Sequence, residues 1–317
     1  MALPTSTFTV YEAIGNREDL SDEIYRIDPT DTPFMSGVDK TKATGVKHEW
    51  QTQALAAAVS SNAVLEGDDA VTDAATPTVR LFNYCQISDK VGSVSGTQEA
   101  VDHAGRDSEY AYQRMLKGLE LKRDMEMTLL TNKPAVAGAA ATARELASIG
   151  AWIATNDDLD ATSGTSPSPI DGSDARNDSS ATRAFTEAQL KNVFNLIWTS
   201  GGKPDVVMVG AFNKQAFSTF TGRATPTEDT KSRKIVATVD AYQSDFGEVK
   251  VVANRFQRAR DALVLQMDMW GVSYLRKFVE RELAVTGDSR RFQILSEYTL
   301  EARNEKASGG VYDLTVA

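Results

Sequence analysis

The residue pattern most suggestive of chemistry is a pair of short motifs of the P-D…E-x-K type. Pro204-Asp205 supplies the first part, and Glu248 with Lys250 supplies the second. In nucleases of this type, two carboxylates hold Mg²⁺ while the lysine positions the attacking water. The two parts are more than 40 residues apart here, which is longer than such a motif normally allows. A Mg²⁺-dependent nuclease is therefore an alternative function and not the leading one.

Nucleophilic or metal-based catalysis has few residues to draw on. The chain has two histidines, His48 and His103, and they do not form a metal-ligand spacing such as H-x-x-x-H. A Ser/His/Asp arrangement would have to use one of them, and the sequence has no G-x-S-x-G nucleophile elbow. We expect His48 to lie in a strand beside Trp50 and His103 to lie on a helix, both as structural or surface groups.

The run Gly201-Gly202-Lys203 has only part of a phosphate-binding loop. The full pattern needs a glycine five residues before Gly202 and a serine or threonine after the lysine, where the chain has Ile197 and Pro204. We interpret the run as the end of a helix followed by the start of a strand.

Two acid-rich stretches are candidates for binding divalent ions. Glu66, Asp68, Asp69 and Asp73 do not match the D-x-[DN]-x-[DN]-G loop that binds Ca²⁺. Residues 156–180 are rich in Asp, Ser, Gly and Pro; they leave a weak ion site open, and we expect a solvated, mobile loop there. Its acids are Asp157, Asp158, Asp160, Asp171, Asp174 and Asp178. We predict no catalytic residue, no cofactor and no metal site.

Composition excludes several classes of protein. The net charge of −10 argues against a protein that coats nucleic acid, because phosphate contacts need a basic surface. Cys85 is the single cysteine, so an intrachain disulfide is impossible, and we expect it to be a small buried apolar group. Met1–Val10 lacks the features of an export signal, and no run of about 20 apolar residues exists. We expect no membrane span, and a protein that is made and kept in a reducing cytosol or leaves the cell by another route.

The first 92 residues suggest an arm and a hairpin. Pro4, Pro29 and Pro33 interrupt residues 1–40, where a short helical run is plausible only near residues 19–26. Residues 46–53 and 78–87 are predicted strands, and the Ala-, Ser- and acid-rich residues 55–77 between them form the extended tip of a long hairpin. A loop this long without structure of its own usually has a partner elsewhere.

A long helix is predicted from about Ser95 to Asn132. Ser95 and Gln98 have the spacing of a capping box. Apolar or small residues then recur at helical intervals, which predicts one continuous rod roughly 50 Å long. These residues are Val101, Ala104, Ala111, Met115, Leu119, Met125 and Leu129. A lone helix of this length indicates a strut, which suits a structural protein better than an enzyme.

An α/β unit is predicted next. Thr186 and Gln189 form a second capping box, followed by Leu190, Val193, Phe194, Ile197 and Trp198 at helical spacing. Strands are predicted at 205–209, 248–253 and 262–267, with a short helix at 213–220. Residues 292–303 alternate between apolar and polar side chains, which predicts a half-buried antiparallel strand.

Four stretches of this chain, taken in register, carry a resemblance to a known family. The first runs from Asp31-Thr-Pro-Phe34 into the run 43–50, and the second joins Ala137-Gly138 to residues 151–156. The third spans 190–209 and includes Trp198, Gly201, Gly202, Pro204 and Asp205. The fourth is 300–307 together with 311–314. Together they resemble the major capsid proteins of tailed bacteriophages, and in particular the SU-ten-like major capsid family, and the resemblance covers nearly the whole chain.

The resemblance implies an α+β protein with the tailed-phage and herpesvirus capsid fold. Residues 1–40 correspond to the N-terminal arm, 41–92 to the extended E-loop hairpin, and 93–185 to a peripheral domain whose spine helix is the one predicted at about 95–132. Residues 186–274 correspond to the axial domain, and 275–317 to strands that return to the peripheral domain.

The resemblance also implies a function. The family builds icosahedral virion shells from hexamers and pentamers, assembled in the bacterial host cytoplasm, around double-stranded DNA that is enclosed without sequence-specific binding. We expect a separate scaffolding protein, because the arm begins at once, together with a portal and a possible decoration protein. No Lys or Arg lies between Lys47 and Arg80, so the lysine cross-link found in some E-loops is not expected.

We also predict how the E-loop contacts a neighbouring subunit. Its tip carries Glu66, Asp68, Asp69 and Asp73 and no basic residue. We expect it to meet basic residues on the spine helix of the adjacent copy, namely Arg114, Lys117, Lys122 and Arg123. Exposed charge pairs contribute only about 0–1 kcal/mol each, so they would set the register while apolar contacts supply affinity.

Overall fold

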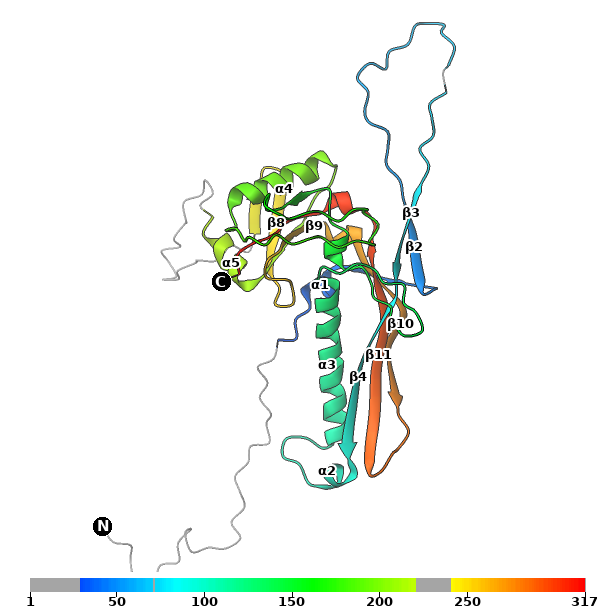
Figure 1. Ribbon diagram of the computed structural model, residues 1–317, viewed down its shortest axis with the longest axis vertical. Helices are drawn as coiled ribbons and strands as arrows, with labels where there is room; N and C mark the ends of the chain where they lie inside the picture. The colour runs from blue at the N-terminus through cyan, green and yellow to red at the C-terminus, as the bar shows by residue number, and fades with distance from the viewer. Residues whose placement is uncertain (1–28, 71, 221–240, 317) are drawn as a thin grey trace, which may run out of the picture.

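The computed structural model describes residues 29–70, 72–220 and 241–316. An elongated body built on one long helix and one long sheet carries an α/β unit at its upper end, and a hairpin projects beyond both (Figure 1). The helical run expected near residues 19–26 lies outside the described residues.

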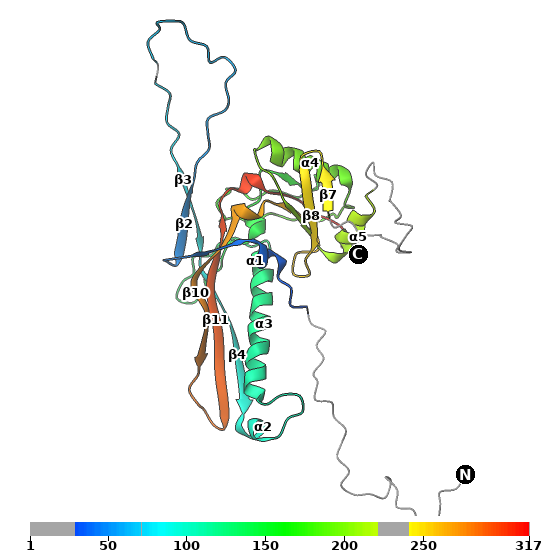
Figure 2. The ribbon, with the colours of Figure 1, turned by 180° about the vertical axis from the view of Figure 1, so that it is seen from behind.

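A four-stranded sheet and the helix α3 (Glu109–Leu129) form the body. The strand order is β1-β10-β11-β4, with β1 parallel to β10 and the other pairs antiparallel. Figure 2 shows α3 running along this sheet, and its buried face includes Leu121, Met125 and Leu129. The strands are β1 (Asp39–Lys42), β4 (Gln86–Ser95), β10 (Trp270–Glu282) and β11 (Ser289–Ala302).

The predicted rod from Ser95 to Asn132 is wrong in one respect, because it is broken into two helices. Ser95 does cap the first of them, α2 (Gly96–Ala100), but the Gln98 side chain contacts His103 and does not complete a capping box. Gly105 then adopts a positive φ of 74°, and Ser108 caps α3 by accepting from the amide of Ala111. Local capping therefore overrides the helical periodicity of residues 101–108.

A buried carboxylate in α3 joins three parts of the chain. Glu126 is fully buried and accepts hydrogen bonds from the amides of Phe34 and Met35, both at 2.8 Å, in the short helix α1 (Pro33–Gly37). It also accepts from the Asn254 side chain at 2.7 Å. Burial raises the pKa of Glu126, although these three donors oppose the shift.

The α/β unit contains a six-stranded sheet in the order β5-β12-β9-β6-β8-β7. Its helix α4 (Glu187–Thr199) begins with the predicted Thr186–Gln189 capping box, and Gly201 follows its end with a φ of 89°. The second helix is α5 (Ala211–Ser218). The strands are β5 (Asp157–Asp158), β6 (Val206–Val209), β7 (Ala241–Ser244), β8 (Gly247–Ala253), β9 (Ala262–Leu265) and β12 (Gly309–Val311).

The sequence predicted that Trp198 belongs to the buried stripe of α4, and this prediction is wrong. Leu190, Val193, Phe194 and Ile197 are buried, whereas Trp198 is 60% exposed. Its ring stacks on Phe246, with ring centroids 5.4 Å apart.

The predicted half-buried strand is correct in position but not in burial. In β11, every residue from Ile294 to Leu300 is buried, including the polar Glu297 and Thr299. The helix α3 packs on one face of the sheet, and Arg144 from the segment after α3 reaches Glu297 at 2.7 Å. The alternating pattern therefore identified the strand correctly, but both faces of the strand are covered.

The predicted hairpin is present as β2 (Lys47–Thr52) paired with β3 (Val79–Tyr84) in an antiparallel register. Its inward side chains anchor it to the body: Trp50 donates to the carbonyl of Ala302 at 2.8 Å, and Asn83 donates to the carbonyl of Leu300 at 2.8 Å. We call residues 53–78 the hairpin loop; its described residues are all exposed. Three 3-10 turns complete the fold, at Ile149–Ala151, Met267–Met269 and Glu305–Ala307.

Candidate interaction surfaces

The residues of the P-D…E-x-K motif, Asp205, Glu248 and Lys250, do not form a metal-binding site. Strands β6 and β8 are parallel neighbours, and the Lys250 amide donates to the Asp205 carbonyl at 2.9 Å. The Asp205 carboxylate, however, accepts from the amide of Met267 at 2.9 Å and so fixes a turn. Among the described residues, no group of three or more His, Cys, Asp or Glu side chains could hold a metal ion. The nuclease alternative gains no support.

The structure brings His48 beside a serine and a glutamate, which the sequence did not predict. His48 Nε2 lies 3.1 Å from Ser273 Oγ and 3.4 Å from a carboxylate oxygen of Glu301. In a catalytic triad the serine and the acid contact opposite ring nitrogens. Here both contact the same nitrogen, so the arrangement cannot relay a proton from serine to acid. His103 was predicted on the long helix but lies in the non-helical link between α2 and α3.

Cys85 is buried, as predicted. Burial raises the pKa of its thiol to about 11, so the reactive thiolate is scarce at neutral pH.

The acid-rich residues 156–180 are not a solvated loop, which corrects the prediction. Arg176 is fully buried; it lies over the ring of Tyr312 at 3.4 Å and donates to Asp261 at 3.0 Å. Asp178 pairs with Arg258, and Asp158 pairs with Arg183. Arg183 and Arg258 therefore pair with two acids of the segment, and Arg176 of the segment pairs with Asp261, so that these contacts hold the segment against the α/β unit.

Among the described residues, the acids of the hairpin loop have no comparable partner. Glu66, Asp68, Asp69 and Asp73 are all exposed. Within the described part of the loop, apolar side chains are exposed as well: Val64 is 84% and Leu65 is 79% exposed. Exposed apolar side chains gathered on one projecting segment indicate a contact surface.

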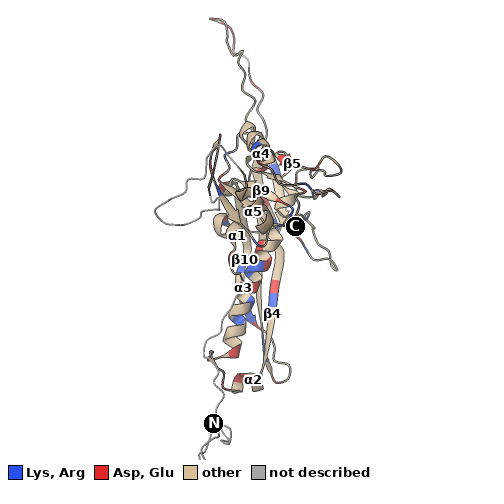
Figure 3. Cartoon of the chain, turned by 90° about the vertical axis from the view of Figure 1, so that its left-hand side faces the viewer, with Lys and Arg blue, Asp and Glu red and all other residues tan. Residues whose placement is uncertain are grey.

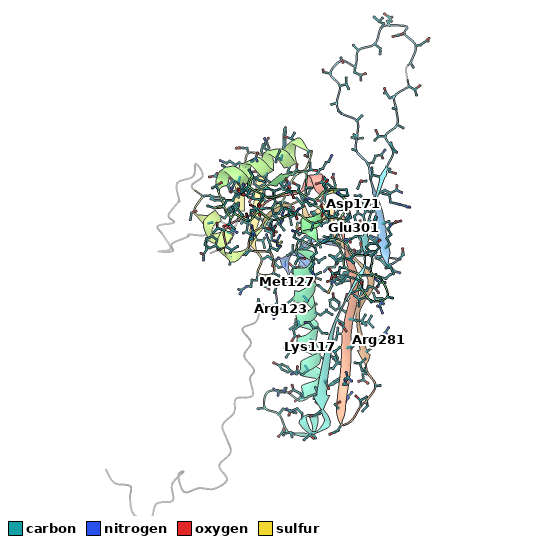
Figure 4. The ribbon with its side chains drawn as sticks, viewed as in Figure 1. Lys117, Arg123, Met127, Asp171, Arg281 and Glu301 are labelled. Carbon is teal, nitrogen blue, oxygen red and sulfur yellow. The ribbon has the colours of Figure 1, made fainter. Side chains whose placement is uncertain are left out.

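The four basic residues of α3 lie where a second surface could form. Arg114 pairs with Glu280 at 3.1 Å, and Lys117 pairs with Glu120 at 2.9 Å. The side chains of Lys122 and Arg123 lie over the rings of Phe278 and Phe256 at 6.0 and 5.6 Å. Figure 4 labels Lys117, Arg123 and Met127 along α3 and Arg281 on β10, and Figure 3 shows charges of both signs on α3.

A groove of about 310 Å³, which we call the α3 groove, separates α3 from β10 and β11. Its lining is mostly apolar, with Lys122 and Glu280 as the charged members. The residues are Met115, Gly118, Leu119, Lys122, Phe278, Glu280 and Ile294. Sequence reasoning missed this groove, since Phe278 and Ile294 come from distant strands. The one available signal was Gly118, a glycine inside a helical pattern, where no side chain fills the space.

Within the described parts of the chain, every helix is too short or too polar to cross a lipid bilayer.

Comparisons with known proteins agree over nearly the full length. Residues 3–315 match the model of the family described as SU10 major capsid protein. A protein of Escherichia phage Phieco32, described as its major capsid protein, is 29% identical in an alignment covering 98% of each chain.

Solved structures share the fold at low sequence identity. A chain of Gordonia phage Cozz is 11% identical with a TM-score of 0.63, covering 99% of this chain and 98% of that one. A chain of the Cyanophage A-1(L) capsid asymmetric unit is 11% identical with a TM-score of 0.66, covering 97% and 98%. The likeness to these structures concerns the fold and extends across nearly all of the chain.

Proposed function

Because this chain belongs to the SU10 major capsid protein family, it is a structural subunit of the virion, and we propose that its copies form hexamers and pentamers of an icosahedral head. Its α+β fold is that of the phage major capsid proteins, and it is not an enzyme. The observation that carries the proposal is the family match across residues 3–315. The shell would enclose double-stranded DNA without reading its sequence, which suits a net charge of −10.

We propose that the chain is divided into domains in the same way as the family. The arm would be residues 1–40, the E-loop hairpin 41–92, the peripheral domain 93–185 with 275–317, and the axial domain 186–274. The six-stranded sheet supports a wider axial unit, because its strands β5 and β12 come from residues 157–158 and 309–311. Assembly in the host cytoplasm, with a scaffolding protein, a portal and a decoration protein, is part of the same proposal.

The contact that we propose between copies joins the hairpin loop of one subunit to the α3 groove of the next. The loop offers Val64 and Leu65 next to the acids at its tip, and the groove offers an apolar floor. Glu66, Asp68, Asp69 and Asp73 would then lie near Arg114, Lys117, Lys122 and Arg123. Apolar burial supplies the affinity, and the charges set the register.

Electron microscopy and sedimentation of the purified chain test the function, with and without a co-expressed scaffold. Hexamers, pentamers, tubes or closed shells are the expected result. A stable monomer or dimer under all conditions would overturn it, and a Mg²⁺-dependent DNA cleavage assay would then decide whether Asp205 and Glu248 have a catalytic role.

A further inference from the structure

The body sheet has a second face, on the side away from α3. In β11, Phe292 contacts an aromatic ring of α3 and Ile294 lines the α3 groove, so the residues that alternate with these two point the other way. Arg281, Gln293 and Val91 are direct partners across β10, β11 and β4, and they share that other side. We call the surface that they form with their same-side neighbours on these strands the outer sheet face, and Figure 4 labels Arg281 on it.

Arginines outnumber acids on the outer sheet face. One carboxylate, Glu297, accepts from two of the arginines at 2.7 Å each, and the other, Asp89, accepts from the neutral Gln293. Among the described residues, Arg281 and Arg291 have no ion pair. The four arginines are Arg144, Arg276, Arg281 and Arg291. In a chain whose net charge is −10, this local excess of positive charge favours an acidic partner.

The same face offers exposed apolar side chains beside a hollow. Along β4, Ile87 is 49% exposed and Val91 is 45% exposed. Ile87 also lines a hollow of about 440 Å³, whose other walls come from residues 137–144 and include the small side chains of Ala139 and Ala143. Exposed apolar side chains next to a concavity, with cations around them, are features of a protein contact surface.

The sequence of residues 1–28 is complementary to this face. These residues include six acids and only two arginines. Apolar residues recur among the acids, since Leu20 and Ile24 are four positions apart and Asp22 and Glu23 lie between them. The segment can therefore offer apolar side chains to the exposed part of β4 and carboxylates to the arginines of β10 and β11.

A neighbouring copy is the simplest source of this segment. The amides of Phe34 and Met35 in α1 bond to Glu126 of α3 at 2.8 Å, so the described chain begins on the α3 side of the sheet (Figure 1). To reach the outer sheet face of its own subunit, the segment would have to turn around an edge of the sheet. We propose that residues 1–28 of one copy dock on the outer sheet face of the next, an inference that rests on the proposed function because it needs copies that assemble.

Site-specific cross-linking of the full-length chain tests the docking. The photoreactive residue p-benzoylphenylalanine replaces Leu20, and equal amounts of isotopically light and heavy chains are assembled together and irradiated. We expect cross-links to peptides of residues 86–95 or 137–144, and random mixing means that about half of them should join a light chain to a heavy one. The same probe at Leu65 is the control, because we place the hairpin loop in the α3 groove and expect no cross-link from it to these peptides.

Charge reversal tests the role of the arginines. Arg281→Glu with Arg291→Glu should lower the yield of this cross-link about three- to tenfold at low salt, the range for two exposed ion pairs. Arg281→Glu alone, at an exposed position, should lower the yield in the same direction and covers the case in which the double variant fails to fold. Lys203→Glu with Lys250→Glu makes an equal change at exposed positions of the α/β unit and should leave the yield unchanged.

The outcomes separate the docking from the proposed function. Asp22→Arg with Glu23→Arg should restore part of the yield when combined with the reversed arginines. Shells that form without the cross-link, cross-links found only within chains of one isotope, or an unchanged yield in Arg281→Glu would each overturn the docking and leave the proposed function standing. If the chain forms no oligomer under any condition, both are wrong.

Discussion

The hairpin loop and residues 156–180 have similar compositions but differ in packing: residues 156–180 pack on the α/β unit, whereas the hairpin loop stays exposed. Both are rich in acids and small residues and lack regular periodicity. Residues 156–180 pack because Arg176 lies within the segment and Arg183 and Arg258 reach it from outside. The hairpin loop has no cation between Lys47 and Arg80, and its described residues stay exposed. The comparison teaches that an acid-rich segment packs where arginines, from within it and from elsewhere in the fold, form ion pairs with buried acids.

The largest effect is expected from removing Arg176, the buried cation that holds residues 156–180 in place. Arg176→Met removes the closest partner of Asp261, which is only 3% exposed and keeps Arg258 at 3.3 Å, and should lower the free energy of unfolding by about 1.5–3 kcal/mol. Urea unfolding of the unassembled subunit measures the loss. Arg114→Met is the control, since its half-exposed pair with Glu280 should change stability by at most about 1 kcal/mol.

A double variant sharpens that test. Arg176→Met combined with Asp261→Asn removes both charges and should recover part of the stability, because the cost lies in a buried carboxylate that then has only the 3.3 Å contact with Arg258 to compensate it. Equal unfolding midpoints for wild type and Arg176→Met would show that the segment is held by other contacts.

The corresponding change in the hairpin loop should affect assembly and spare the fold. Val64→Asp with Leu65→Asp removes two side chains that we expect to be buried by a neighbour, each worth about 1.5–3 kcal/mol. Sedimentation should show loss of shells, while unfolding of the subunit is unchanged because both side chains are exposed within it. Ser60→Asp with Ser61→Asp adds equal charge to the same loop and should still assemble. Wild-type shells from the first variant would refute the α3 groove as the partner.

Charge reversal at the loop tip should have a smaller effect. Asp68→Lys with Asp69→Lys should weaken assembly at low salt and reduce its sensitivity to added salt, by at most about 1 kcal/mol for each pair. Lys122→Glu with Arg123→Glu on α3 should partly restore assembly in the combined variant. If neither assembly nor its salt sensitivity changed, the acids would have no role in docking.

The smallest effect that we expect is a difference between the two segments in their response to acid pH. Burial raises the pKa of Asp178, but Arg258, Arg176 and Arg260 outweigh it, and the net pKa is lowered. A lowered pKa in the folded state means that Asp178 stabilises the fold above about pH 4 and loses this effect as pH falls further. After correction for the intrinsic effect of pH on exchange, amides of residues 156–180 should open about two- to fivefold more often at pH 3 than at pH 5, while those of the hairpin loop should show no such change. Asp178→Asn should remove most of the rise.

Much of the fold could be predicted because its signals are local. The capping box at Thr186, the apolar strand β6 and the two strands of the hairpin each depend on residues that are close in sequence. The break between α2 and α3 was also encoded locally, in Gly105 and Ser108, but the helical spacing of apolar residues concealed it.

The contacts between distant segments could not be predicted in this way. Arg176 finds Asp261 and Tyr312 far along the chain, and the α3 groove combines Leu119 with Phe278 and Ile294. The basic residues of α3 were identified from sequence, but their docking to the loop acids stays a prediction. Hydrophobic periodicity identifies which face of an element is covered and leaves its partner open.

The carboxylate of Glu126 connects α1, α3 and the α/β unit mechanically. The short helix α1 is held at the last turn of α3 by the same side chain that holds Asn254 of the α/β unit. A force on the chain at α1 is therefore delivered to the C-terminal turn of α3, at the end of the helix that adjoins the α/β unit. Because the same carboxylate also accepts from Asn254, a displacement of α1 is transmitted to the body and to the α/β unit at one point.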